Sequence, residues 1–209
     1  MTTYPITPRT KVKRGQQRAS YDVELVHNIL DEAYICHVGA KMADRPMVQP
    51  TVHWRVEDKL YIHGSSKNGL FQTLLAGEEA CITVTILDGL VMARSSFHHS
   101  ANYRCVMIFA KATKIEEESE KLRLLDLMME KITPDRLKDV RGPNPQELKA
   151  TTVLAFDLKE VSAKVRTGPP VDDDEDYALP VWAGVIPVDQ KLGKPVDDPR
   201  WVEDHGRKD

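Results

Sequence analysis

The sequence has few cysteines, no long apolar run and no excess of positive charge. Its 209 residues include three cysteines, and its formal net charge is −3. No apolar stretch approaches the roughly 20 residues that a membrane-spanning helix needs. A chain without a basic excess has no general attraction for nucleic acid or for an anionic membrane surface. We therefore expect no nucleic-acid or membrane partner, and any anionic ligand must be held by a local site.

The cysteines predict a reducing compartment. Cys36, Cys81 and Cys105 are far apart, odd in number and each set in an apolar stretch. That pattern is typical of buried free thiols. The basic segment 1–18 lacks the apolar stretch of a secretory signal. We expect a cytoplasmic protein.

Several common catalytic motifs are also missing. There is no Walker loop and no GxGxxG after a strand, so a nucleoside-triphosphate or dinucleotide fold is not indicated. No HExxH or CxxC supports zinc, and no GxSxG supports a serine hydrolase. The adjacent His98 and His99 would point opposite ways in an extended segment. We therefore predict no metal site.

Apolar residues make up 41% of the chain, enough for one folded domain. The basic, proline-containing residues 1–19 predict an extended arm, residues 20–188 the folded domain, and residues 189–209 a C-terminal tail. Ser20 is expected to cap the first helix.

The alternation of apolar residues and the turn signals predict a mainly β, α+β fold. Asp88-Gly89 is a hairpin signal. Strands are expected at 33–41, 47–56, 59–63, 80–87, 90–93, 103–115 and 151–161, and helices at 21–32, 69–76 and 116–132. About six mostly adjacent strands predict a closed or partly open antiparallel barrel with flanking helices.

The strand-to-helix turn at 63–69 is the most informative segment. His63 ends a strand, and Gly64 permits a sharp turn and a close approach of backbone to ligand. Ser65 and Ser66 offer hydroxyls or a helix cap, and Lys67 adds a positive charge. The first N–H groups of a helix favour a phosphate. A plain capped helix after a tight turn is the alternative.

A second candidate group lies on the preceding strand, at Gln49, Pro50, Thr51 and Val52. Pro50 removes a ladder donor in mid-strand, which predicts a bulge or a strand edge. Backbone groups left free there could pair with a flat heterocycle. An edge merely protected by proline is equally consistent with the sequence.

Further candidates come from the donor-rich loop 94–104 and from the C-terminal part of the chain. The residues in the loop are Arg94, Ser95, His99, Tyr103 and Arg104. Arg166, near Lys164 at a strand end, could pair with a phosphate or a ring carbonyl. Alternatively, both are surface charges offset by the acidic run 172–176, which we expect to be solvated. Trp182 could stack on a flat ligand, and its apolar segment 180–187 should pack on the barrel or on a second subunit.

Six segments together, 19–22, 33–39, 61–65, 94–104, 164–170 and 180–184, resemble the FMN-binding split-barrel family related to pyridoxamine 5′-phosphate oxidase. The likeness is greatest to its branch of flavin-nucleotide-binding and nitroimidazole-resistance proteins, and it spans roughly residues 18–188. The resemblance implies a six-stranded antiparallel split β-barrel that forms a homodimer with FMN at the subunit interface.

The resemblance also implies roles for individual residues. Residues 49–53 would run beside the isoalloxazine ring, and Ser65, Ser66 and Lys67 would hold the phosphate. Ser66 stands where the oxidase has an arginine, so a second cation must come from elsewhere. The candidates are Arg94, Arg104 and Arg166. The oxidase's substrate-binding tail has no clear match here, so activity on pyridoxamine phosphate is not expected.

The expected activity is transfer of hydride or electrons from a nicotinamide donor, NADH or NADPH, to a small acceptor. The flavin carries such chemistry, while the protein binds and orients it. His53 and His99 are candidate proton relays because neutral histidine exchanges protons near neutral pH. A non-catalytic FMN carrier or sensor and a haem-binding split-barrel protein are the alternatives.

Overall fold

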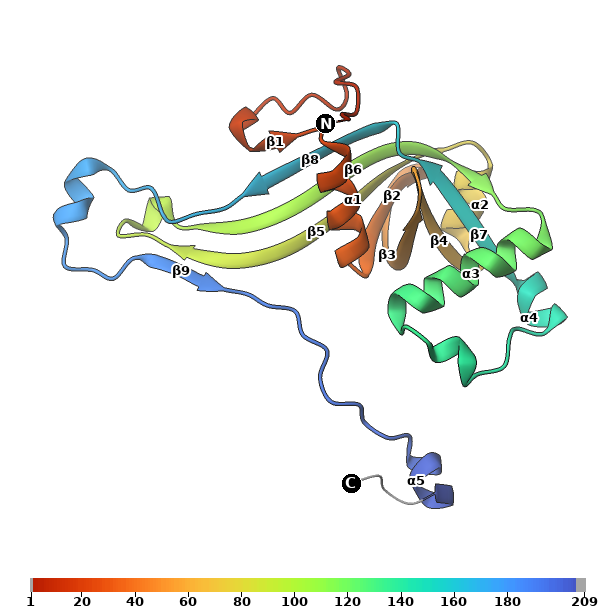
Figure 1. Ribbon diagram of the computed structural model, residues 1–209. Helices are drawn as coiled ribbons and strands as arrows, with labels where there is room; N and C mark the ends of the chain where they lie inside the picture. Colours follow the sequence, from red (N-terminus) through yellow and green to blue (C-terminus); the bar gives the residue numbers. More distant parts are fainter. Residues whose placement is uncertain (1, 206–209) are drawn as a thin grey trace.

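Six antiparallel strands close into a ring in the computed structural model, which describes residues 2–205 (Figure 1). The order around the ring is β2-β3-β4-β7-β6-β5 and back to β2. Their bounds are β2 Ile35–Met42, β3 Arg45–Val56, β4 Lys59–Ser65, β5 Glu79–Met92, β6 Ser100–Lys114 and β7 Thr151–Asp157. Closure pairs strands that would otherwise be open edges. The predicted six-stranded antiparallel split barrel is confirmed.

Three short strands extend the sheet beyond the ring. β8 (Glu160–Arg166) pairs with β6, β1 (Ala19–Ser20) pairs with β8, and β9 (Gly184–Pro187) pairs with β5. The long β5–β6 hairpin projects away from the barrel, and β8 and β9 flank it (Figure 1). Part of the predicted apolar segment 180–187 therefore packs on this hairpin.

The described residues include five α-helices. They are α1 Val23–Glu32, α2 Gly69–Leu75, α3 Glu118–Ile132, α4 Pro145–Ala150 and α5 Pro199–His205. Of these, α1 to α4 pack on barrel strands, and α5 lies beyond the extended segment that follows β9 (Figure 1). Short 3₁₀ turns add η1 Gln16–Arg18, η2 Ser96–His98, η3 Arg136–Lys138 and η4 Asp174–Ala178. The cap of α1 is Asp22, whose Oδ1 accepts from Leu25 N at 2.8 Å. The cap is thus two residues later than the predicted Ser20, which instead accepts from Asp22 N.

Two predicted strand boundaries are wrong. Residues 80–93 do not fold into a hairpin at Asp88-Gly89, because β5 runs through them with only a register shift between Leu87 and Gly89. A Cβ on Gly89 would lie 2.8 Å from Val185, so glycine permits the close approach of β9. The predicted strand 151–161 is two strands, since β7 belongs to the ring and β8 lies outside it.

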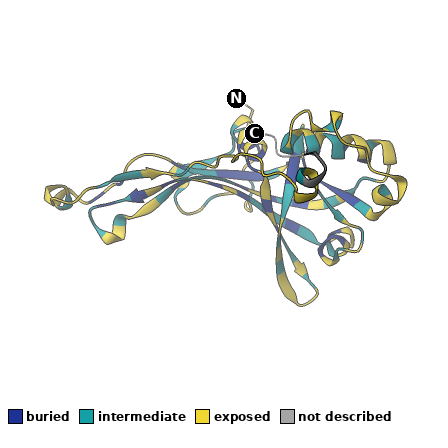
Figure 2. Ribbon diagram, turned by 90° about the horizontal axis from the view of Figure 1, so that it is seen from below, coloured by how far each residue is buried: buried dark blue, intermediate teal, exposed yellow. Residues whose placement is uncertain are grey.

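The core has two parts, which Figure 2 shows as dark bands on the barrel strands. One fills the ring and extends to α1 and α2, with Ile29, Phe71 and Ile108 fully or almost fully buried. The other lies between α3 and the outside of β3, β4 and β7, around Trp54 and Leu124. His63 on β4 comes next to this second cluster, since its ring centroid is 6.1 Å from that of Trp54.

A buried polar group ties α3 to the end of α1. The Lys131 ammonium donates to the carbonyls of Leu30, Ala33 and His53 at 2.8, 2.6 and 3.1 Å. The Leu30 carbonyl also accepts from His53 Nε2 at 2.9 Å. These bonds satisfy carbonyls that the helix end leaves without partners. Burial lowers the pKa of Lys131 to about 8.

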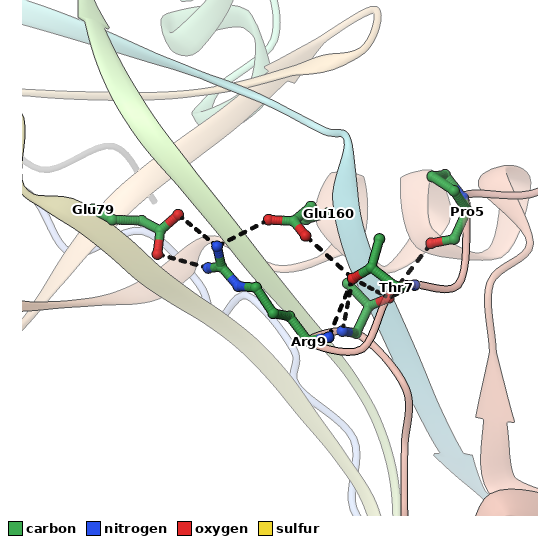
Figure 3. A network of polar contacts seen from close by, with 6 residues as sticks. Pro5, Thr7, Arg9, Glu79 and Glu160 are labelled. Carbon is green, nitrogen blue, oxygen red and sulfur yellow. Dashed lines mark hydrogen bonds and ion pairs between the residues drawn. The ribbon is translucent and has the colours of Figure 1, made fainter.

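The N-terminal arm is pinned across the outside of the sheet (Figure 3). Arg9 donates two hydrogen bonds to Glu79 of β5, at 3.0 and 2.6 Å. It also forms an ion pair with Glu160 of β8 at 3.2 Å. Its guanidinium lies 4.8 Å from the centre of the Phe109 ring. Thr7 also donates to Glu160. The arm therefore has a fixed path that leads into η1.

Candidate functional site

The turn between β4 and α2 uses most of its backbone donors internally. Asn68 caps α2, because its Oδ1 accepts from Leu70 N and Phe71 N at 2.9 and 3.3 Å. Ser66 N donates to Ala150 O, and Lys67 N donates to Ser65 Oγ. The expectation that Ser65 or Ser66 caps the helix is therefore wrong. The turn is left with side-chain donors for an anion.

Two of these side-chain donors are free among the described residues. The Ser66 hydroxyl has no hydrogen-bond partner, and the exposed Lys67 ammonium has no ion pair in residues 2–205. A lysine without a carboxylate partner keeps its full charge for a ligand. The turn therefore still offers one cation and one hydroxyl to a phosphate.

Beside the turn runs a strand segment with one open side. Residues 45–52 of β3 pair with β2 alone, and only residues 53–56 pair with β4. Among the described residues no strand pairs with the other side of 45–52, so Pro50 lies on an edge, one of the two predicted alternatives. Gln49 Oε1 accepts from Asn68 Nδ2 at 3.3 Å, which joins this edge to the turn. Gln49 thus contacts the turn that carries Lys67, while Pro50, Thr51 and Val52 follow it along the same open edge.

Gly64 has a packing role rather than a turn role. A Cβ there would lie 3.0 Å from the Phe71 ring, and Gly64 is still part of β4. The glycine therefore lets α2 pack closely on β4.

His63 points away from the turn into a small apolar cavity. This cavity has a volume of about 250 Å³. Its apolar walls come from α3 and from the proline-containing segment 133–144, namely Leu125, Met128, Met129, Leu137, Val140 and Pro143. The His63 ring makes no hydrogen bond to any other described residue, and its Nδ1 is buried. Burial lowers the pKa of His63, so its imidazole is neutral at neutral pH.

The three arginines proposed as a second cation differ in whether a carboxylate already pairs with them. Arg94 pairs with the fully buried carboxylate of Asp172 at 3.1 Å. Arg104 binds both Asp88 and Glu32. Two of the three guanidiniums are thus already neutralised. Asp172 also shows that the acidic run 172–176 is not entirely solvated, which corrects that expectation.

Arg166 has no carboxylate partner among the described residues. It is only 8% exposed and donates to Asn102 Oδ1, Gly168 O and Pro169 O, all neutral acceptors. The alternative that the acidic run offsets Arg166 is wrong. Arg166 pairs with Tyr103 on β6, and about 33 Å of strand separates Tyr103 from Thr113, where β7 joins β6. The structure therefore does not bring Arg166 to the Lys67 turn of the same chain.

The remaining candidates fall into different places. Ser95 caps η2, Tyr103 lies beside Arg166, and Trp182 is 65% exposed with its ring against Gly184. His99 is exposed on the loop, where its Nδ1 donates to Ser95 O at 2.9 Å. His53 is fully buried, so it cannot reach a surface ligand directly. All five of these residues lie outside the Lys67 turn.

One group of metal-type ligands occurs among the described residues. His98, Asp173 and Asp176 place their ligand atoms within 4.8 Å of one another. His98 Nε2 lies 3.3 Å from Asp173 Oδ2, and Asp173 is exposed. The pairing of a histidine with an exposed aspartate accounts for this contact without an ion. The absence of a metal site stays a prediction.

The sequence reasoning missed Asn68 and Asp172. Asn is a strong helix-capping residue, and Asn68 directly precedes the apolar run of α2, so its role was readable. Asp172 gave no such signal, because its partner Arg94 lies far away in the sequence.

The chain belongs to the pyridoxamine 5′-phosphate oxidase family, whose model matches residues 22–165. Among solved structures, it is 43% identical to the flavocytochrome Anf3 from Azotobacter vinelandii, with a TM-score of 0.89 over 93% of this chain and 90% of that one. It is 34% identical to an FAD and heme binding protein from Mycobacterium smegmatis, with a TM-score of 0.83 over 87% and 89% of the two chains. A putative 5-nitroimidazole antibiotic resistance protein from Bacteroides thetaiotaomicron shares the fold, at 24% identity, a TM-score of 0.60, and 70% and 86% coverage. A search among curated protein sequences gave no match.

None of the described helices combines the length and the apolar character that crossing a membrane would require.

Proposed function

We propose that the protein binds a flavin nucleotide along the free edge of β3, with the phosphate next to the flavin's ribityl chain at Ser66 and Lys67. The observation that carries this proposal is the Gln49–Asn68 hydrogen bond, which holds an unpaired strand edge against a turn with a free cation. Unpaired backbone groups suit the polar rim of an isoalloxazine ring, and Lys67 suits the phosphate. FMN and FAD share this phosphate, so the site takes either. FMN remains our first expectation.

Membership of the family and the likeness to a flavocytochrome and to an FAD and heme binding protein support a flavin. A bound flavin would supply hydride and electron transfer, and this chain's residues would bind and orient it. The proposed activity passes electrons from NADH or NADPH to a small acceptor. Of the two suggested proton relays, only His99 is exposed to a ligand.

The substitution Lys67→Ala tests the phosphate site. Loss of one charge-assisted contact costs about 1.5–3 kcal/mol, so we expect flavin affinity to fall about tenfold or more. The measurement is a fluorescence titration of flavin-depleted protein with FMN and with FAD. Lys111→Ala, an exposed lysine without an ion pair on β6, is the matched control. Equal affinities for the two variants would move the phosphate away from this turn.

A second cofactor, haem, is favoured by His63. The neutral ring has no protein partner and faces apolar and methionine side chains, which is the donor and environment that a haem iron takes. The relatives that are 43% and 34% identical to this chain are a flavocytochrome and an FAD and heme binding protein, which supports haem as well. The cavity of about 250 Å³ is smaller than the ~300–1,000 Å³ of ordinary ligand pockets. Residues 133–144 would therefore have to move outward for a porphyrin to enter.

We also propose a homodimer through the outer face of the sheet. Ile35, Val48, Leu87 and Met107 are exposed on β2, β3, β5 and β6, opposite the strand faces that fill the barrel. Beyond β9 the chain runs away from the barrel, with Leu192 and Val196 more than four-fifths exposed (Figure 1). An exposed apolar sheet face and an extended arm with exposed Leu192 and Val196 fit a second copy of the chain. Light scattering should give twice the mass of one chain, and a monomeric mass would contradict the dimer.

A further inference from the structure

Three positive side chains gather where the N-terminal arm meets the end of β8. Lys164 and Arg166 lie on the same face of β8, because residues two apart on a strand point the same way. Arg18 is the last residue of η1 and directly precedes Ala19, which pairs with Lys164. Among the charged groups near Arg166, Arg18 has the largest effect on its pKa. We call Arg18, Lys164 and Arg166 the arm cluster.

The arm cluster has no acidic partner among the described residues. None of its three members forms an ion pair there, and Lys164 Nζ donates to a neutral acceptor, Arg14 O, at 3.2 Å. The hydrogen bonds of Arg166 also end on neutral oxygens. Glu160, the acid on β8 itself, is paired with Arg9 and lies opposite Phe109, at the other end of β8 from Arg166. The positive charge is therefore uncompensated.

This arrangement is costly unless an anion completes it. A guanidinium does not lose its proton in proteins, so the buried Arg166 stays charged. A buried charge without a counter-charge opposes folding, and a second guanidinium nearby adds repulsion. Burial first, and then Arg18, lower the pKa of Arg166, which agrees with an unfavourable environment for the cation.

The arm cluster is also held in place before any ligand arrives. Arg9 anchors the arm to β5 and β8 (Figure 3), and Tyr21 donates to Thr10 O at 3.0 Å. Arg166 is fixed by three hydrogen bonds to Asn102 and the 168–169 turn. Donors fixed in advance lose little freedom on binding.

We propose that the arm cluster is a second anion site, which binds the phosphate group of a ligand. Two guanidiniums and an ammonium match the charge of a phosphate, and guanidinium forks bind its oxygens in pairs. Within one chain the arm cluster is separate from the Lys67 turn, as the length of β6 between them shows. The proposal concerns a second place in the same chain and does not rest on the flavin proposed at the Lys67 turn.

The test is calorimetric titration of Lys67→Ala protein with pyrophosphate, so that the flavin turn contributes no cation. We expect one pyrophosphate site per chain. Adding Arg18→Gln or Arg166→Gln should lower the affinity for pyrophosphate about tenfold or more. Lys111→Gln in the same background should bind like the parent. Arg18→Gln serves even if the buried Arg166→Gln fails to fold. A parallel titration with ADP distinguishes the source: tighter binding than pyrophosphate identifies a nucleotide, and equal binding a phosphate alone.

Two results would overturn the proposal. The first is that pyrophosphate does not bind the parent, or binds all variants equally. The second is that light scattering shows dissociation of Arg18→Gln and Arg166→Gln protein into single chains, in which case these cations pair with acids of a second copy. These results can be interpreted whether or not Lys67→Ala protein binds flavin, because the titration measures pyrophosphate alone.

Discussion

We expect the variant His63→Ala to lose the Soret band of the proposed haem and to keep the visible bands of the proposed flavin. The reason is that the two candidate sites are separated, one facing outward from β4 and the other on the turn after it. His63 faces the cavity beneath α3, while Lys67 lies on the turn that adjoins the free edge of β3. Removing the imidazole deletes the ligand to iron and leaves the flavin contacts intact. Absorption spectra of protein purified with and without added haem measure both cofactors at once.

Two other histidines serve as controls. His37 is exposed on β2 and His99 on the 93–99 loop, and alanine at either position should leave the Soret band unchanged. A Soret band that survives His63→Ala and disappears in a control would move the iron ligand to that residue. Simultaneous loss of flavin and haem would instead indicate that the variant is misfolded.

The second large effect is a loss of stability in acid, caused by His53. Its Nε2 donates to Leu30 O, and its Nδ1 is buried without a partner. Protonation would put a charge on Nδ1 next to the ammonium of Lys131. Burial, and then Lys131, lower the pKa of His53 to about 4, while nearby Asp31 acts in the opposite direction.

The sign of the effect follows from this lowered pKa. The unfolded histidine takes up a proton below its ordinary pKa of about 6.5, and the folded one resists until about 4. The contribution of His53 is therefore complete above that ordinary pKa and is lost as the pH falls toward 4. The free energy of unfolding should decrease by about 3 kcal/mol over this range, beyond what the carboxylates contribute.

The matched variant is His53→Gln, which keeps an N–H donor for Leu30 O and does not titrate. Urea unfolding at a series of pH values should show a shallower acid dependence for His53→Gln than for the parent. The exposed His99→Gln should keep the parental dependence. If His53→Gln and the parent lose stability in parallel, the buried histidine does not govern acid unfolding.

Much of the barrel could be predicted from the sequence because its strands carry local signals. The expected strands 47–56 and 59–63 correspond to β3 and β4, which the tight turn at Glu57-Asp58 joins, with Glu57 at a φ of 52°. The continuous β5 could not be foreseen, since Asp88-Gly89 reads locally as a hairpin. Two distant contacts override that signal: β9 packs on Gly89, and Arg104 binds Asp88.

In the candidate site, too, some features have local sequence signals and others depend on distant contacts. The turn at 63–69 and the irregular strand at 49–52 were separate candidates in the sequence, and the structure joins them through Gln49 and Asn68. It also separates His63 from Lys67, because β4 directs His63 to the α3 side. The pairing of Arg94 and Arg104 with acids depends on tertiary contacts that no local pattern encodes.

The absorption spectrum of the purified protein tests the account most directly. We predict the two visible bands of an oxidised flavin, together with a Soret band in protein supplied with haem. A colourless protein that takes up neither FMN nor FAD on titration would contradict the proposed flavin site at the β3 edge and Lys67.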